Sequence, residues 1–220
     1  RGSNGNGYEC IVPVSGGKDS INQAYMMSQV YKLRTLMVMQ VPHMHTIEGI
    51  ENLNAMVSGL DLDLIKIAVR PRPHQWIRRL ATLKLGNPSY PEHHLIFSLV
   101  ARVASLYAAP LVVWGEDIGV EFGGTVSATS AANGSAEDLI KNDLFHESGF
   151  EELLEGTVPD NQLYFYSHPD KEELGRRRIR SIYLGYYHWW DGFKHLNVAK
   201  GLGFVSRDKP LPGNLLPYDN

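Results

Sequence analysis

The segment Val12-Pro13-Val14-Ser15-Gly16-Gly17-Lys18-Asp19-Ser20 constrains the fold of this chain more than any other stretch. Apolar residues over 8–14 predict a short buried strand, and apolar residues at three- and four-residue steps after Asp19 predict a helix. A strand, a glycine-rich turn and a helix in this order direct several backbone N–H groups at one anion, and the helix dipole adds positive partial charge there. The segment therefore predicts a phosphate-binding loop.

The residue types in this loop suit a phosphate ligand. Gly16 and Gly17 let the backbone approach a phosphate closely, and the hydroxyls of Ser15 and Ser20 can donate hydrogen bonds to it. Asp19 either caps the helix or holds a magnesium ion. A plain strand-to-helix turn with a serine cap is the alternative interpretation. The chain contains no Walker A sequence, so the loop differs from that of P-loop nucleoside triphosphatases.

Length and composition favour one α/β domain. The chain has 220 residues, of which 43% are hydrophobic and 20% charged, as is usual for globular proteins. Its net charge of −3 gives no global reason to expect nucleic-acid binding. We expect a flexible lead or remnant over 1–7, the domain over 8–208 and an irregular tail over 209–220.

The cysteine count and hydropathy bear on the compartment. Cys10 is the single cysteine, which excludes an intramolecular disulfide and argues against a cysteine-based zinc site. No apolar run of eighteen or more residues occurs, so the sequence predicts no membrane span. We therefore expect a cytoplasmic protein.

Apolar stretches alternate with helical patterns along most of the chain. Because alternation of this kind is typical of parallel sheets with right-handed crossovers, we predict a five-stranded parallel sheet of order 3-2-1-4-5 with helices on both faces. The predicted strands are 8–14, 35–41, 62–69, 110–114 and 180–184, with a further strand over 162–167. The predicted helices begin near Asp19 and cover 46–60, 75–85, 95–109 and 191–202, with two short ones within 136–154.

Ligands of open parallel sheets bind outside the carboxyl ends of the strands. Besides the loop after the first strand, polar groups follow the second strand at Gln40 and the fourth at 115–117. In the predicted order the first and fourth strands are neighbours, so Asp19 and Glu116 can face the same phosphates or metal. An ordinary loop acid is the alternative for Glu116.

Other clusters of polar or aromatic residues can be interpreted as purely structural. The close histidine pairs are typical of surface or capping residues, and the aromatic run 186–190 is typical of core or interface packing. The arginines at 176–178 and 180 either form a solvated face or neutralise pyrophosphate. The histidine pairs are His43 with His45 and His93 with His94.

The loop resembles the pyrophosphate loop of PP-loop ATP pyrophosphatases, which cleave ATP between the α- and β-phosphates. Several blocks together resemble one branch of that superfamily, the N-acetyl sugar amidotransferases of bacterial surface-polysaccharide biosynthesis. The matching blocks are 10–20, 52–54, 114–116, 121–124, 183–185, 190–191 and 199–203. The chain lacks a cysteine-containing segment that relatives usually carry ahead of the first strand, and relatives tend to continue further. We therefore expect either a trimmed domain or a minimal relative.

This resemblance implies a HUP-type Rossmann-like fold and an enzyme that adenylates an acceptor oxygen, releases pyrophosphate and lets ammonia displace AMP. It implies ATP and Mg²⁺ as cofactors, with catalytic roles for Lys18, Asp19 and Glu116 and metal binding by Asp19 and Glu116. The residues expected to bind ATP are Val14, Ser15, Gly16, Gly17, Asp19, Ser20, Gln40 and Gly115.

The acceptor is expected to be a small molecule such as a nucleotide-activated amino sugar. Tyr90, His93 and Glu121 offer hydrogen bonds for a polar acceptor, and Gly123 and Gly124 allow close backbone approach. The alternative is that Tyr90 and His93 only cap a helix, and that the long loop after the fourth strand, which begins at 121–124, is only a disordered lid. No glutaminase signature is present, so ammonia comes from a partner glutaminase or from solution; the oligomeric state, a homodimer included, stays open.

Two other functions fit the same fold. A PP-loop tRNA or nucleotide thiolase generally needs a set of reactive cysteines, which Cys10 alone cannot supply. A non-catalytic HUP-type module would bind ATP or AMP without turnover. Release of pyrophosphate in the presence of an acceptor separates an enzyme from such a module.

Overall fold

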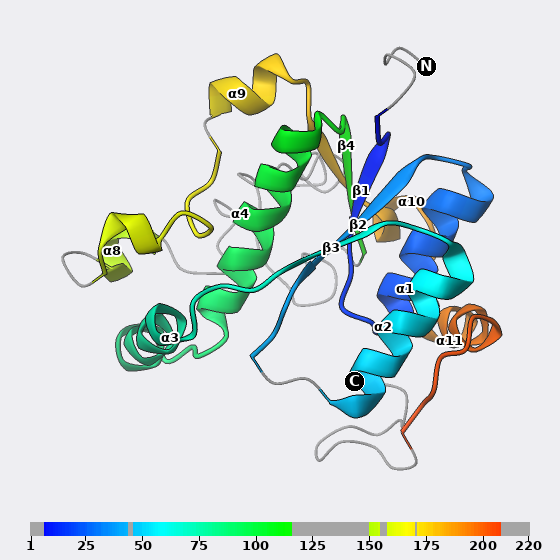
Figure 1. The fold of residues 1–220 in the computed structure, drawn as a ribbon, viewed down its shortest axis with the longest axis horizontal. Helices are drawn as coiled ribbons and strands as arrows, with labels where there is room; N and C mark the ends of the chain where they lie inside the picture. The colour runs from blue at the N-terminus through cyan, green and yellow to red at the C-terminus, as the bar shows by residue number, and fades with distance from the viewer. Residues whose placement is uncertain (1–6, 44–45, 116–149, 155–157, 170, 208–220) are drawn as a thin grey trace.

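A parallel five-stranded sheet forms the centre of the molecule (Figure 1). The computed structural model describes residues 7–43, 46–115, 150–154, 158–169 and 171–207. The strand order is β3-β2-β1-β4-β5, and every neighbouring pair is parallel, which confirms the predicted fold class. The strands are β1 (Cys10–Pro13), β2 (Thr35–Gln40), β3 (Leu64–Ile67), β4 (Leu111–Trp114) and β5 (Arg180–Tyr183).

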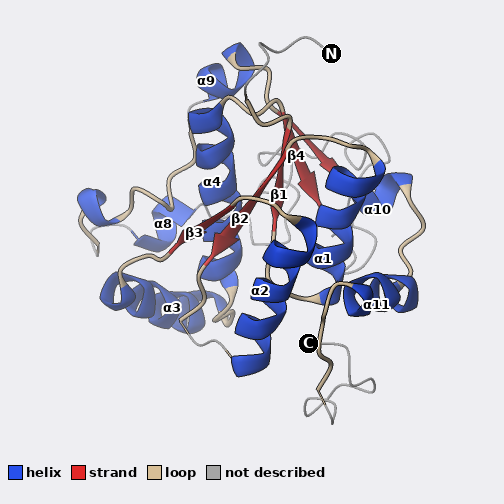
Figure 2. Cartoon of the chain, turned by 45° about the vertical axis from the view of Figure 1, so that its right-hand side comes forward, coloured by secondary structure: helices blue, strands red, loops and turns tan. Residues whose placement is uncertain are grey.

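Helices cover both faces of this sheet (Figure 2). One hydrophobic core joins the sheet to α3, α4 and α8, and a second joins it to α1, α2 and α11. The main helices are α1 (Lys18–Tyr25), α2 (Ile47–Leu60), α3 (Pro71–Leu85), α4 (Tyr90–Tyr107) and α11 (Gly192–Gly201). Shorter ones are the π-helical η1 (Met26–Val30), α8 (Phe150–Leu154), η2 (Asp160–Gln162), α9 (Lys171–Arg176) and α10 (Leu184–Tyr187).

Local sequence signals account for several helix boundaries. The Thr46 hydroxyl accepts a hydrogen bond from the Gly49 N–H at 3.0 Å, so Thr46 is the N-cap of α2 as predicted. Pro91 lies in the first turn of α4, where its missing N–H leaves no helical bond unmade. The helix α4 is apolar almost all round because it packs against the sheet on one side and against α3, α8 and the turn at residues 163–167 on the other.

The prediction of a strand over 162–167 is wrong. The backbone there forms local turns, with the Tyr166 and Ser167 N–H groups donating to the Leu163 carbonyl oxygen. Its carbonyls are bound by side chains of α4, through Ser98 to Phe165 and His94 to Tyr166. Because α4 satisfies these backbone groups, the apolar residues of the turn pack on the helix without any strand partner.

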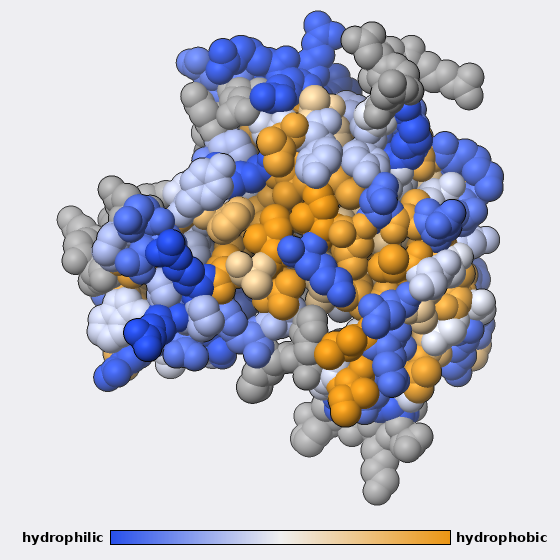
Figure 3. All heavy atoms as spheres, in the orientation of Figure 1, coloured by the Kyte–Doolittle hydropathy of each residue, from blue (hydrophilic) through white to orange (hydrophobic). Residues whose placement is uncertain are grey.

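The sheet edge at β3 is partly open. Leu64, Ile65 and Ile67 are only half-buried, and Figure 3 shows hydrophobic side chains gathered over the middle of this face of the molecule.

No helix among the described residues is long and apolar enough to cross a bilayer.

Candidate functional site

The turn after β1 has the strand–turn–helix geometry that the sequence predicts. The chain continues the sheet past Pro13, since the Val14 N–H donates to the Val38 carbonyl oxygen at 2.9 Å. It then turns at Gly16, whose φ of +88° lies in the left-handed region that favours glycine. The helix α1 begins two residues later, so its N-terminus lies at the carboxyl edge of the sheet. This is the edge at which open parallel sheets bind ligands.

The loop serines hold the turn together. The Ser20 hydroxyl accepts from the Ser15 N–H at 3.3 Å and donates to the Gly17 carbonyl oxygen at 2.9 Å. The Gly17 N–H donates to the Ser15 hydroxyl at 3.3 Å. The N-cap of α1 is Gly17, and no side chain caps the helix there. The interpretation of Asp19 as a helix cap is therefore wrong, and the uncapped helix terminus retains its attraction for an anion.

Asp19 instead lies between two cationic or proton-donating side chains. Its Oδ2 is 2.8 Å from Lys18 Nζ, and its Oδ1 is 2.7 Å from Nδ1 of His195. Lys18 and His195 are both buried. Burial alone would raise the pKa of Asp19, but the hydrogen bonds from His195 and Lys18 outweigh it and hold the pKa below its usual range. Asp19 is therefore a carboxylate at neutral pH.

The segment that leads into α11 forms a wall of this site. The Trp190 ring lies 4.5 Å from the His195 ring, centroid to centroid, and Gly192 lies against the Lys18 side chain. A Cβ atom on Gly115 would lie 3.2 Å from both the Gln23 amide oxygen and the Trp190 ring. Trp190 thus links Gly115, at the end of β4, with the histidine that binds Asp19. Two of the predicted site residues, Asp19 and Gly115, are thereby connected through Trp190 and His195.

The sequence does not predict two residues of the site, His195 and Gln23. The buried face of α11 carries His195, Leu196 and Ala199, and a histidine on the apolar face of an amphipathic helix was the available signal. The Gln23 amide donates to the Val113 carbonyl oxygen and so ties α1 to β4. Gln40 ends β2 as predicted, and its amide donates to the adjacent Val41 carbonyl oxygen at 2.9 Å.

The described residues offer a partial fit for Mg²⁺. They contain no group of three or more side chains that could hold a metal ion. Magnesium at nucleotide sites is usually held by one or two carboxylates together with phosphate oxygens and water, and Asp19 can supply one such carboxylate. Both of its oxygens already accept a hydrogen bond. Glu116, the other predicted ligand, lies outside the described residues.

The predicted acceptor residues do not share one environment. Tyr90 is only 3% exposed and packs in the core against the rings of His94 and Phe150. His93, by contrast, is exposed on the first turns of α4. Glu121, Gly123 and Gly124 lie outside the described residues.

A second polar cluster lies on the β3 side of the carboxyl edge. Nδ1 of the buried His74 is 2.6 Å from the Tyr166 hydroxyl, and its Nε2 is 3.2 Å from the Glu92 carboxylate. The same carboxylate oxygen is 3.0 Å from Nε of Arg78. Burial would raise the pKa of Glu92, but His74 and Arg78 together lower it below its usual value. This cluster joins α3, α4 and the 163–167 turn.

The arginines at 176–180 lie at the wrong edge for pyrophosphate. Arg180 opens β5 and pairs with Leu111, the first residue of β4, whereas the phosphate loop follows the last residue of β1. Arg176 to Arg178 come before Arg180 and are exposed. The hypothesis that they neutralise pyrophosphate is therefore wrong, and the arginines form the solvated face that was its alternative.

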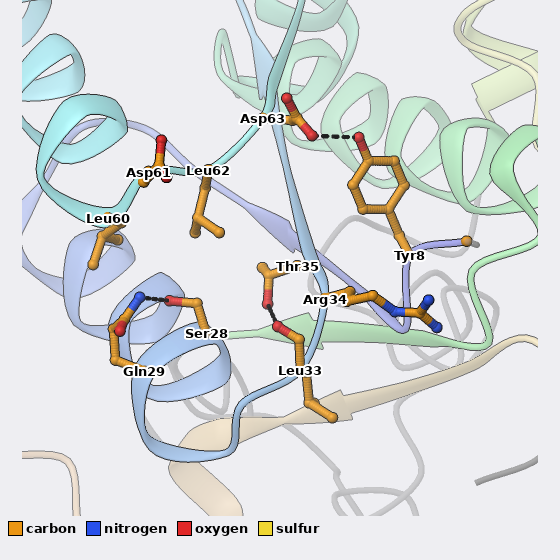
Figure 4. Close-up of a pocket in the computed structure, with 11 residues that line it drawn as sticks. Tyr8, Ser28, Gln29, Leu33, Arg34, Thr35, Leu60, Asp61, Leu62 and Asp63 are labelled. Carbon is orange, nitrogen blue, oxygen red and sulfur yellow. Dashed lines mark hydrogen bonds between the residues drawn. The ribbon is translucent and has the colours of Figure 1, made fainter. Parts of the chain in front are cut away.

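A cavity of about 630 Å³ lies at that opposite, amino edge (Figure 4). The Tyr8 hydroxyl donates to Asp63 at 2.7 Å in its wall, which raises the pKa of Tyr8 to about 12. Ser28, Thr35 and Leu60 also line it. Because this cavity lies at the amino ends of the strands and the phosphate loop follows the carboxyl end of β1, the cavity belongs to a different surface of the molecule.

No family model matches the chain, and no curated protein matches its sequence. Among solved structures, the chain is similar to the NH3-dependent NAD synthetase of Campylobacter jejuni, with 14% identity and a TM-score of 0.42 over 80% of this chain and 84% of that one. It is also similar to the NMN synthetase of Francisella tularensis, with 16% identity and a TM-score of 0.40 over 89% of this chain and 84% of that one. The Rossmann-like arrangement of this chain is established by its own sheet order.

Proposed function

We propose that this chain is an ATP-dependent amidotransferase or ligase that forms AMP and pyrophosphate. One observation carries the proposal: the glycine turn after β1 delivers the Lys18–Asp19 ion pair to an uncapped helix N-terminus at the carboxyl edge of the sheet. A helix terminus and a buried ammonium group at one place favour a polyanion such as the phosphates of ATP. The resemblance of the loop to those of PP-loop enzymes selects the pyrophosphate-releasing reaction.

The reaction has two steps. An acceptor oxygen attacks the α-phosphorus of ATP, the bond from that phosphorus to the bridging oxygen breaks, and pyrophosphate leaves with the electron pair. Ammonia then attacks the activated carbon, the bond from carbon to the phosphate ester oxygen breaks, AMP leaves, and a proton is released from the nitrogen. Adenylation is needed because an amide or carboxyl oxygen is a poor leaving group.

The protein contributes position and charge to these steps. The N–H groups at the start of α1 and the Lys18 ammonium face the region where negative charge develops on pyrophosphate. Lys18 is kept in place by Asp19, at 2.8 Å. Magnesium bound to the phosphates would neutralise their charge, with Asp19 and Glu116 as its protein ligands.

The acceptor belongs beyond the phosphates, toward the start of α4. The exposed His93 supports a polar acceptor there, and the acceptor class that fits the resemblance is a nucleotide-activated amino sugar. Glu121, Gly123 and Gly124 complete the proposed acceptor set, whereas the buried Tyr90 packs in the core beneath the start of α4. Ammonia is supplied by a partner glutaminase or taken from solution.

A thiolase is disfavoured by the state of the single cysteine. Cys10 is fully buried in β1, and burial raises the pKa of its thiol to about 11, so the reactive thiolate is scarce at neutral pH. A non-catalytic nucleotide-binding module remains the second candidate, since the same helix terminus would bind ATP without turnover.

Nucleotide products test the proposal. The protein is incubated with ATP, Mg²⁺, ammonium and a panel of amino-sugar nucleotides, and the products are separated by chromatography. We expect AMP and pyrophosphate that increase with one acceptor. ADP as the main product would overturn the assignment, and tight ATP binding without any turnover would support the non-catalytic module.

A further inference from the structure

We propose that His195 is a positioning residue of the phosphate site, and that α11 is therefore part of the catalytic machinery. This inference rests on the proposed function and assigns a role within it to a residue 176 positions away from the loop aspartate. A carboxylate only accepts hydrogen bonds, so the 2.7 Å contact requires that His195 donates from Nδ1 to Oδ1 of Asp19.

The two contacts to Asp19 come from different elements. Lys18, the neighbour of Asp19 on α1, binds Oδ2, and His195 on α11 binds Oδ1. An aspartate held at one oxygen can still rotate about its side-chain bonds, whereas one held at both oxygens is fixed in a single rotamer. With Asp19 fixed, the Lys18 ammonium that binds it is fixed as well.

The surroundings of His195 hold the imidazole in turn. The side chain is 7% exposed, and the Trp190 ring packs against it edge to face. Asp191 caps α11 by accepting from the N–H groups of Phe193 and Lys194, which sets where the helix begins. Gly192 is the first residue of α11, and a Cβ atom added to it would lie 3.4 Å from Cε of Lys18. The start of α11 thus contacts both members of the ion pair.

Two substitutions separate the hydrogen bond from the packing. His195→Leu keeps an apolar side chain against Trp190 but removes the donor. His195→Asn removes the ring but places an amide N–H near the position of Nδ1. If His195 acts by positioning Asp19, kcat for pyrophosphate release falls about 10- to 100-fold in His195→Leu, because a misplaced catalytic group reduces the rate by this order. His195→Asn should recover most of that loss.

A matched control is available at His188. This histidine also contacts a side chain from another element, the Tyr31 hydroxyl, but lies outside the phosphate site. Because His188 is only half-buried, we expect His188→Leu to lower the melting temperature less than His195→Leu does. It should leave kcat within about twofold, since it touches no group near the loop. The KM for ATP should change less than kcat in His195→Leu.

A second measurement needs no turnover. In ¹⁵N-histidine NMR spectra, we expect the His195 Nδ1–H proton to be protected from exchange in the wild type and to lose that protection in Asp19→Ala. Loss of protection supports the contact even if no acceptor for the enzyme is found, so it separates this inference from the proposed function. The inference is overturned if His195 is unprotected in the wild type, if His195→Leu retains wild-type kcat, or if His195→Asn is as impaired as His195→Leu.

Discussion

A side chain on Gly16 would crowd the backbone of Gly49, because an added Cβ atom would lie 3.1 Å from the Gly49 carbonyl oxygen. The phosphate loop therefore passes directly against the first turn of α2, and a side chain fits there only if this backbone moves by a few tenths of an ångström. The φ of Gly16, +88°, adds a second reason, since L-residues in the left-handed region lose about 1–2 kcal/mol.

Replacing Gly16 by alanine should displace the loop. We expect Gly16→Ala to lower the melting temperature and to weaken ATP binding by about tenfold or more, since the N–H groups that face the phosphates must move. Gly86→Ala is the control, because Gly86 has a φ of +66° but nothing within 4 Å of its added Cβ. It should lose stability through the backbone alone and retain ATP affinity, as measured by calorimetric titration. Equal ATP affinity in both variants would contradict the close packing of the loop.

Asp19→Asn removes the charge that holds Lys18 and His195. We expect turnover to fall by about 10²-fold or more, as on losing one electrostatic stabiliser, with a lower melting temperature because Lys18 loses its counter-ion. Asp63→Asn is the control, since Asp63 binds Tyr8 at the opposite edge of the sheet. Steady-state kinetics decides, and near-wild-type turnover in Asp19→Asn would remove Asp19 from the mechanism.

His93→Ala tests the proposed acceptor side. Because His93 is exposed and separate from the loop, its loss should abolish acceptor-stimulated pyrophosphate release while ATP affinity stays within about threefold. Tyr90→Phe should have little effect on either quantity, because the Tyr90 side chain is buried in the core. A tenfold fall in ATP affinity in His93→Ala would instead move this residue into the nucleotide pocket. The corresponding test of Glu121 is Glu121→Gln.

The stability of the protein should fall between pH 6.5 and pH 4 through His168. Burial, with His94 and Arg102 nearby, lowers the pKa of His168 from 6.5 to about 4. In this interval the unfolded chain binds the proton and the folded chain does not, so stability is present above pH 6.5 and is lost as the pH falls. The full loss is at most about 3 kcal/mol. Urea unfolding at several pH values gives the free energy of unfolding as a function of pH. We expect a smaller slope of this free energy against pH for His168→Gln than for the wild type. Identical slopes would show that His168 is accessible to protons in the folded protein.

Much of the sheet could be predicted because each strand is a short apolar run bounded by polar or turn residues. The run that ends at Val14 and the run at 110–114 have no competing helical pattern, and both form neighbouring strands. The run at 162–167 looks similar in sequence but forms a turn on α4. Periodicity describes only the chain itself, and the groups that bind this backbone, Ser98 and His94, lie about 70 positions earlier in the sequence.

The loop half of the candidate site could also be predicted, because a single contiguous segment carries it. The α11 half could not. His195 and Trp190 reach the loop only through the tertiary packing of α11 on α1, and sequence spacing carries no information about such a contact. The arginines at 176–180 show the converse error, since their charge suited pyrophosphate while their place before β5 put them at the other edge of the sheet.

The contact of α11 with α1 has a consequence for the order in which the protein matures. During synthesis the phosphate loop leaves the ribosome before its partner histidine, which follows 176 residues later. At about 5–20 residues per second, that gap lasts roughly 10–35 s. For this time the nascent chain has a glycine loop and an aspartate with only one of its two partners, so ATP met before α11 emerges encounters an unfinished site.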